Sequence, residues 1–177
     1  WVLTGGEPSR DEGLRRGDIA LARVTLPQAN LGQSPESHMV VLFDSSASTL
    51  IDFKRRLTRL SSLISRLDKE RVKGLTVIAF DQDAERVFSG PITDFGQRHI
   101  SALEVRGALG ASSLEVGLKA AAQSLAEGTQ KGLMRRVLLI SDGVFTFGPS
   151  TPGALRALIQ STLSAQGVSR VDALVEQ

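Results

Sequence analysis

The stretch that most constrains the fold is an apolar run that ends in a carboxylate and several hydroxyls, HMVVLFDSSAS at residues 38 to 48. An unbroken apolar run such as Met39 to Phe43 is typical of a strand buried on both faces, as in a parallel sheet covered by helices. In such sheets, ligands bind beyond the carboxyl ends of the central strands. We therefore expect Asp44, Ser46 and Ser48 to lie at that edge of the sheet.

The side chains at this edge are oxygen donors. Carboxylate and hydroxyl oxygens are the ligands that magnesium, manganese and calcium prefer. Ser46 and Ser48 are also placed to cap the helix expected directly after them. The sequence thus predicts a divalent cation held by oxygens at the end of a central strand.

Other segments predict the rest of an α/β domain. Leu75–Phe80 and Arg135–Ser141 are further apolar strands, and Ser169–Val175 is a later one. Asp81 to Ala84 turns the chain into a short strand, Glu85–Phe88, which we expect at the sheet edge as the second arm of a hairpin. The predicted fold is a doubly wound, mostly parallel sheet flanked by helices, with one short antiparallel edge strand.

Helical periodicity appears between the predicted strands. After Ser48, apolar residues recur at steps of three and four, which predicts a helix of about five turns; they are Leu50, Phe53, Leu57, Leu60, Ile64 and Leu67. A helix is also expected from Leu114 to Leu125 and another from about Pro152 to Ala165. Pro91 to Gly107 reads as irregular or briefly helical, with His99 at the surface.

Two later segments carry further candidate ligands. A loop containing Gly110 places Ser112 and Ser113 just before a helix, where a serine could equally be a simple N-cap. The strand Arg135–Ser141 ends in Asp142 and Gly143, which repeats the plan of the first strand. Because neighbouring strands are roughly 4.8 Å apart, aspartates on adjacent parallel strands would approach one cation from two sides.

Together, these three segments resemble the metal-ion-dependent adhesion site (MIDAS) of the von Willebrand factor type A (vWA) domain, and the resemblance covers about residues 38 to 177. The family pattern is Asp-x-Ser-x-Ser after the first strand, a threonine in a Gly-rich loop, and an aspartate followed by glycine after a later strand. The resemblance assigns the metal ligands, with Ser113 as an alternative to Ser112; the assigned set is Asp44, Ser46, Ser48, Ser112 and Asp142.

The resemblance implies a function. In the family, the serines and the threonine bind Mg²⁺, the aspartates act partly through water, and a partner's Asp or Glu carboxylate completes the coordination shell. The implied function is metal-dependent protein binding of the adhesion type, with Mn²⁺ or Ca²⁺ as alternatives to Mg²⁺. It also suggests an extracellular or cell-envelope location.

The chain departs from the family pattern at two positions. Ala47 stands where glycine is usual, and Ser112 stands where threonine is usual, which leaves a freer rotamer at that ligand. These departures keep a second interpretation open, in which the domain is a structural or assembly scaffold with an empty metal site. The chain is also expected to lack the last helix of the family.

The first 37 residues form a separate region in this interpretation. Asp18 to Pro27 reads as a strand, either the remnant of a preceding domain or an extra edge strand of the main sheet, and Pro27 to Ser37 is a linker. A strand running into a vWA domain is similar to inter-alpha-trypsin-inhibitor-like proteins, in which a small VIT domain precedes the vWA domain. The vWA domain is expected over residues 38 to 177.

Composition excludes several other classes. The chain of 177 residues has no cysteine, which removes disulfides, thiolate zinc sites and cysteine nucleophiles, and its net charge of +2 gives no nucleic-acid footprint. No apolar stretch approaches the roughly 20 residues of a transmembrane helix. An enzyme is not expected, because Ser46 occupies the position of the second aspartate of haloacid-dehalogenase-like phosphatases and no P-loop lysine motif occurs.

Overall fold

The computed structural model describes residues 12–16, 19–23, 35–67, 71–128, 132–149 and 151–175. The chain divides into two units, residues 1–34 and residues 35–177. In the first unit, strands β1 (Glu12–Arg16) and β2 (Ile19–Arg23) pair antiparallel in a sheet of their own. β2 falls within the strand expected from Asp18 to Pro27, whereas β1 was not expected. The expected kinship of this region to a VIT domain stays a prediction.

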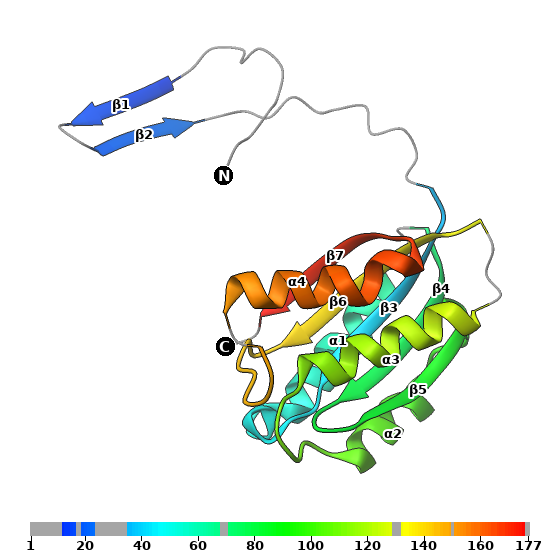
Figure 1. The fold of residues 1–177 in the computed structure, drawn as a ribbon. Helices are drawn as coiled ribbons and strands as arrows, with labels where there is room; N and C mark the ends of the chain where they lie inside the picture. The colour runs from blue at the N-terminus through cyan, green and yellow to red at the C-terminus, as the bar shows by residue number, and fades with distance from the viewer. Residues whose placement is uncertain are drawn as a thin grey trace. The chain divides into compact units, whose positions relative to one another are not determined.

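The second unit is a three-layer α/β domain, with a five-stranded sheet in the order β5-β4-β3-β6-β7. β3, β4, β6 and β7 run parallel, and β5 pairs antiparallel with β4 at one edge, as the sequence predicted. Figure 1 shows the strands in this order. Their bounds are β3 Ser37–Asp44, β4 Val72–Phe80, β5 Ala84–Pro91, β6 Met134–Ser141 and β7 Val168–Val175.

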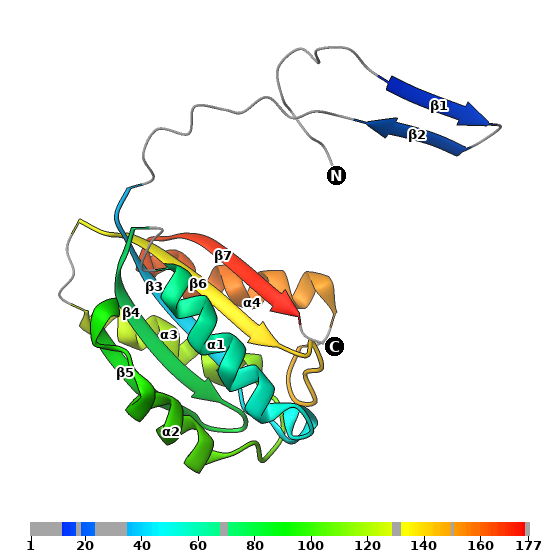
Figure 2. The ribbon, with the colours of Figure 1, turned by 180° about the vertical axis from the view of Figure 1, so that it is seen from behind.

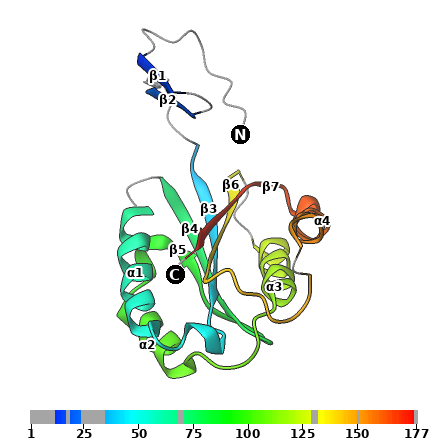
Figure 3. The same ribbon diagram turned by 90° about the vertical axis from the view of Figure 1, so that its left-hand side faces the viewer.

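Helices cover both faces of this sheet. α1 and α2 lie on one face, and α3 and α4 lie on the other (Figure 3). Figure 2 shows the sheet from the side of α1. The α-helical bounds are α1 Phe53–Leu67, α2 Gln97–Arg106, α3 Leu114–Glu127 and α4 Pro152–Leu163, and short 3₁₀ turns occupy η1 Ala47–Thr49, η3 Ile92–Asp94 and η4 Ser164–Gln166. No helix in the described ranges has the length and apolar character that crossing a membrane requires.

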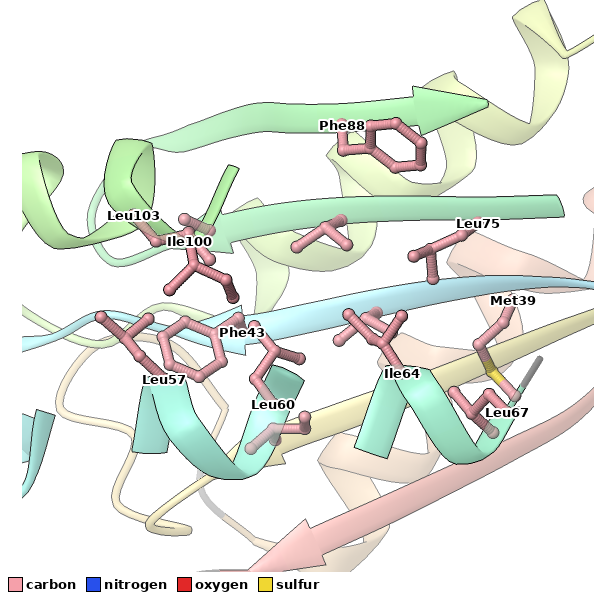
Figure 4. Close-up of a cluster of buried hydrophobic side chains, with 14 of the residues drawn as sticks. Met39, Phe43, Leu57, Leu60, Ile64, Leu67, Leu75, Phe88, Ile100 and Leu103 are labelled. Carbon is pink, nitrogen blue, oxygen red and sulfur yellow. The ribbon is translucent and has the colours of Figure 1, made fainter. Parts of the chain in front are cut away.

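The position of β3 between two layers of helices explains why its apolar run is continuous. Its residues are buried from one end to the other, and they contribute alternately to two cores. Met39 and Phe43 belong to the core beneath α1 and α2, which Figure 4 shows, whereas Val40 and Leu42 belong to the core beneath α3 and α4. A strand that faces apolar helices on both sides has no polar face, so its sequence does not alternate.

The first helix begins later than the periodicity predicted. α1 starts at Phe53, and Leu50, the first residue of the expected stripe, is 59% exposed. Residues 47–49 instead form a 3₁₀ turn, and the side chain of its N-cap residue, Ser46, makes no capping hydrogen bond. The prediction that Ser46 and Ser48 cap the long helix is therefore wrong, because the 3₁₀ turn and the residues after it separate them from its first turn.

α2 is a regular helix where the sequence predicted an irregular or briefly helical segment. Residues 97–106 form a helix of 10 residues, but only Ile100 and Leu103 are buried on it, which is too weak an apolar pattern to read from the sequence. His99 is half-buried, and its ring stacks on Phe95 with 5.2 Å between the ring centroids. Its pKa is lowered, first by burial and then by the charge of Arg98.

Close packing of α3 on the sheet depends on Gly117. A Cβ atom at this position would lie 2.9 Å from the ring of Phe80, which is fully buried at the end of β4. We expect Gly117→Ala to lower the free energy of unfolding by about 1–2 kcal/mol, because the strain of overpacking outweighs the helix propensity that alanine adds.

Denaturant unfolding measures this difference, and Gly153→Ala is the matched control. Gly153 lies in the first turn of α4, and a Cβ atom there would meet nothing within 4 Å. We expect the stability of that variant to be unchanged or slightly raised. Equal stabilities for the two variants would show that α3 moves away from Phe80 without cost.

Candidate metal centre

The predicted ligands come from three loops at the carboxyl edge of the sheet. The first loop follows β3, the second precedes α3, and the third follows β6. β3 and β6 are neighbours and run parallel, so Asp44 and Asp142 lie at the ends of adjacent strands, on the same side of the sheet. In Figure 2 the loops after β3 and β6 lie side by side at this end.

Asp44 lies at the centre of the cluster and is fully buried. Its Oδ1 accepts a hydrogen bond from the Ser46 backbone N–H at 3.0 Å. Its Oδ2 accepts hydrogen bonds from Ser112 Oγ at 3.2 Å and from Ser141 Oγ at 2.6 Å. Three donors therefore fix the carboxylate, and they come from all three loops or strand ends that build the site.

The serine hydroxyls of the cluster bond to Asp44 or to one another. Ser112 Oγ donates to Asp44, and Ser46 Oγ and Ser48 Oγ share one hydrogen bond at 3.1 Å. A hydroxyl that donates its proton still has lone pairs for a cation. These oxygens are thus oriented as ligands and belong to the class that Mg²⁺, Mn²⁺ and Ca²⁺ prefer.

The outer part of the cluster is open to solvent. Ser48 is exposed and Asp142 is partly exposed, and both line a pocket of about 290 Å³ together with Thr49, Ile51, Asp52, Arg56 and Arg59. Asp142 Oδ1 accepts a hydrogen bond from the Val144 N–H in its own loop at 2.9 Å. An ion could therefore enter from solvent and meet Ser48 and Asp142 first.

Ser112 and Ser113 have different surroundings. Ser112 reaches Asp44, whereas Ser113 Oγ is buried and has no hydrogen-bond partner. Ser113 is the N-cap residue of α3, although its side chain makes no cap hydrogen bond. The structure thus brings Ser112, and not Ser113, together with Asp44.

The two departures from the family pattern are compatible with this geometry. Ala47 is not among the residues with a positive φ, so glycine is not required there, and its N–H donates to Gly110 O at 3.0 Å. The Ser112 backbone is held on both sides, because its N–H donates to Thr146 Oγ1 at 2.9 Å and its carbonyl accepts from the Thr146 N–H at 3.1 Å. A fixed backbone limits the freedom that serine gains over threonine. Gly143, with φ of 80°, does require glycine.

Several residues that support the candidate ligands through hydrogen bonds were not predicted from the sequence. Ser141 donates a hydrogen bond to the buried Asp44, whereas the next residue, Asp142, lines the solvent-open pocket. Arg56 is buried on α1 and donates to Asp44 O at 2.8 Å. Arg106 donates to Ser45 Oγ at 3.2 Å and to Asp81 Oδ2 at 2.8 Å. Arg56 thus holds the main chain at Asp44, and Arg106 holds the side chain of the next residue, Ser45, against Asp81.

The described residues contain no group of three or more His, Cys, Asp or Glu side chains that could hold a metal. The candidate site does not depend on such a group, because its donors are hydroxyls and two carboxylates. The donor set present fits a hard divalent cation held by hydroxyl and carboxylate oxygens, and it excludes a thiolate site.

No protein-family model matches the sequence. The chain is 29% identical over 143 residues to the uncharacterized protein YfbK of Escherichia coli K12, a match that covers 76% of this chain and 24% of YfbK. The chain thus spans about a quarter of the length of that relative.

Two solved structures resemble the domain in fold. An aerotolerance-related membrane protein from Bacteroides fragilis matches with a TM-score of 0.52 at 24% identity, over 78% of this chain and 67% of that one. Proximal thread matrix protein 1 of the mussel byssus, with a zinc-occupied MIDAS motif, matches with a TM-score of 0.54 at 19% identity, over 78% of this chain and 37% of that one. Sheet order, helix layers and these likenesses show a vWA-like fold.

Proposed function

We propose that the chain is a divalent-metal-dependent protein-binding module. The metal would be held at the carboxyl edge of the sheet by Asp44, Ser46, Ser48, Ser112 and Asp142, and a partner's Asp or Glu carboxylate would complete its shell. One observation carries the proposal: the buried Asp44 carboxylate accepts three hydrogen bonds among serine hydroxyls, and the solvent-open pocket beside it is lined by Ser48 and Asp142.

The chemistry favours recognition over catalysis. Neutral hydroxyl ligands leave a bound cation strongly electrophilic, so an incoming carboxylate is held tightly, and without the cation Asp44 and Asp142 repel the same carboxylate. We assign no catalytic residue. Of the two histidines, His38 is buried at the start of β3, at the opposite edge of the sheet, and His99 packs on α2 against Phe95.

The bound metal in the mussel byssus protein supports a metal role for this site, and the ligand set favours Mg²⁺, Mn²⁺ or Ca²⁺. We also propose a cell-envelope or extracellular location. The membrane protein from Bacteroides fragilis and the byssus matrix protein support it by their fold likeness.

Thermal unfolding in EDTA and in millimolar MgCl₂, MnCl₂, CaCl₂ or ZnCl₂ tests the metal site. A ligand present at about 100 times its dissociation constant stabilises the folded state by roughly 2.7 kcal/mol. For a domain of this size, that corresponds to an upward shift of the midpoint by about 5–10 °C. We expect such a shift with at least one of the four ions.

Asp142→Ala should abolish the shift with little loss of stability in EDTA, because this side chain is partly exposed and accepts its hydrogen bond from Val144 in its own loop. Asp94→Ala is the matched control, since Asp94 is exposed in η3, away from the three loops. A wild-type midpoint that no ion moves would reject the metal proposal and favour the scaffold interpretation.

A further inference from the structure

Large apolar side chains are exposed on the same three loops that carry the candidate metal ligands. Their exposed fractions range from 52% to 96%, and they are Leu50, Ile51, Leu109, Val144 and Phe147. Each lies within a few residues of a ligand: Leu50 follows Ser48, Leu109 precedes Ser112, and Val144 follows Asp142. Clustered exposed apolar residues beside polar groups mark interaction sites, whereas isolated ones are ordinary.

Main-chain hydrogen bonds join the three loops. The Leu109 N–H donates to Ser45 O at 3.0 Å, and the Ala47 N–H donates to Gly110 O at 3.0 Å. The Phe147 N–H donates to Ser112 O at 3.1 Å. The apolar side chains therefore stand on a backbone that is already organised, so a partner would meet a prepared surface and lose little of its binding energy to ordering these loops.

An apolar pocket lies beside the metal pocket. It has a volume of about 490 Å³, and its lining includes Leu50, Ile51, Phe53, Gly107 and Ala108. Ile51, which is 96% exposed, also lines the 290 Å³ pocket that holds Ser48 and Asp142. Ile51 thus lies between a place for a charged group and a place for an apolar one.

The charges around these pockets indicate the occupant. Three carboxylates and two guanidinium groups lie at or next to the metal pocket; they are Asp44, Asp52, Asp142, Arg56 and Arg59. A bound divalent cation would bring the net charge of these groups to +1, which favours an anionic group on the partner. The mouth of the apolar pocket carries Asp52, Lys54, Arg55 and Glu104, and Lys54 pairs with Glu104 at 3.2 Å. Such a polar rim around an apolar centre is typical of a protein interface, and insertion into lipid would bury these charges.

We propose that the partner is a protein segment in which an acidic residue is next to a large apolar residue. The acidic side chain reaches the metal, and its Phe, Leu, Ile, Met or Trp neighbour passes Ile51 into the apolar pocket. This inference rests on the proposed metal site and adds the identity of the neighbouring side chain.

A peptide array tests the inference. Each peptide carries one Asp or Glu in a Gly/Ser background, with every standard amino acid in turn placed before or after the acid. The 177-residue chain is applied in Mg²⁺, Mn²⁺ or EDTA. We expect metal-dependent binding at least about 10-fold stronger for acids with a large apolar neighbour than for acids flanked by serine, the size of effect that a buried anchor gives.

Two variants separate this inference from the proposed function. Ile51→Ser should reduce the apolar preference by about 10-fold, the loss of one anchor contact, and leave the metal-induced thermal shift unchanged, since Ile51 provides no ligand. Asp142→Ala should remove both. Met134→Ser is the control, because Met134 is an exposed apolar residue (38%) at the start of β6, at the opposite edge of the sheet.

Three results would overturn the inference. Metal-dependent binding to acidic peptides whatever their neighbour would retain the proposed function and reject the apolar pocket as a specificity site. A thermal shift without binding to any acidic peptide would reject both the carboxylate partner and the apolar neighbour. Metal-dependent binding to phosphatidylserine vesicles that Ile51→Ser abolishes, with no peptide preference, would assign the apolar residues to a lipid surface.

Discussion

Replacing Asp44 by alanine is expected to abolish metal-induced stabilisation and also to destabilise the metal-free domain. The sequence places Asp44 as a ligand at an edge of the sheet, and such a position by itself predicts little loss of stability. The structure changes that expectation, because Asp44 is fully buried and accepts hydrogen bonds from the Ser46 N–H, Ser112 Oγ and Ser141 Oγ. Each buried donor left without an acceptor costs about 1–3 kcal/mol.

Removing a buried charge acts in the opposite direction, because it relieves the desolvation of the carboxylate. Two of the three donors are hydroxyls that can rotate toward other acceptors, which reduces the free-energy cost of leaving them without Asp44. We therefore expect a net loss of about 2–3 kcal/mol in EDTA for Asp44→Ala, measured by denaturant unfolding.

Asp44→Asn separates the two roles of this residue. Asparagine keeps the shape and an acceptor for the Ser46 N–H, and the two hydroxyls can turn to accept from its amide. Stability in EDTA should therefore be closer to that of the wild type, while the thermal shift with metal should be lost in both variants. If the Asp44→Asn variant kept the full shift, the carboxylate would not be needed for the ion.

The strands of this domain could be predicted because the signals that define them are local. β3 and β4 face helices on both sides, so they appear as continuous apolar runs, and the antiparallel edge strand β5 follows directly from the turn after β4. The start of α1 could not be predicted, because Leu50 continues the apolar stripe in sequence but faces solvent beyond a 3₁₀ turn. At the start of that turn, the Ala47 N–H bonds to the carbonyl of Gly110, a residue distant in the chain.

The same distinction applies to the site. The candidate ligands lie in short patterns of the sequence, whereas their supports act across long sequence separations, such as Arg106 on Asp81 and Ser141 on Asp44. One signal was present for Arg56: it lies three residues after Phe53 and four before Leu60, on the buried face of α1. A charged residue at such a position requires buried partners.

Arg56→Ala is expected to lower the free energy of unfolding by about 3–5 kcal/mol, the combined cost of a cavity and of two buried carbonyls left without their donor. The side chain is 4% exposed and donates from Nη1 to Asp44 O at 2.8 Å and from Nη2 to Ile140 O at 3.4 Å. Its guanidinium also lies 5.0 Å from the centre of the Phe43 ring. Truncation leaves a cavity and removes donors from two buried carbonyls.

Arg56 also bears on metal binding, because the two carbonyls belong to the ends of β3 and β6, the strands that are followed by the loops carrying Ser48 and Asp142. One planar guanidinium thus connects both halves of the site, and a lysine has no fork with which to bond both carbonyls.

We expect Arg56→Lys to recover part of the stability and still to show a smaller thermal shift with metal than the wild type. Arg55→Ala, its exposed neighbour on α1, should change stability by less than about 0.5 kcal/mol and leave the shift intact. A full metal shift in Arg56→Lys would mean that Arg56 supports the fold alone, and that the spacing of the two strand ends is set by the sheet without it.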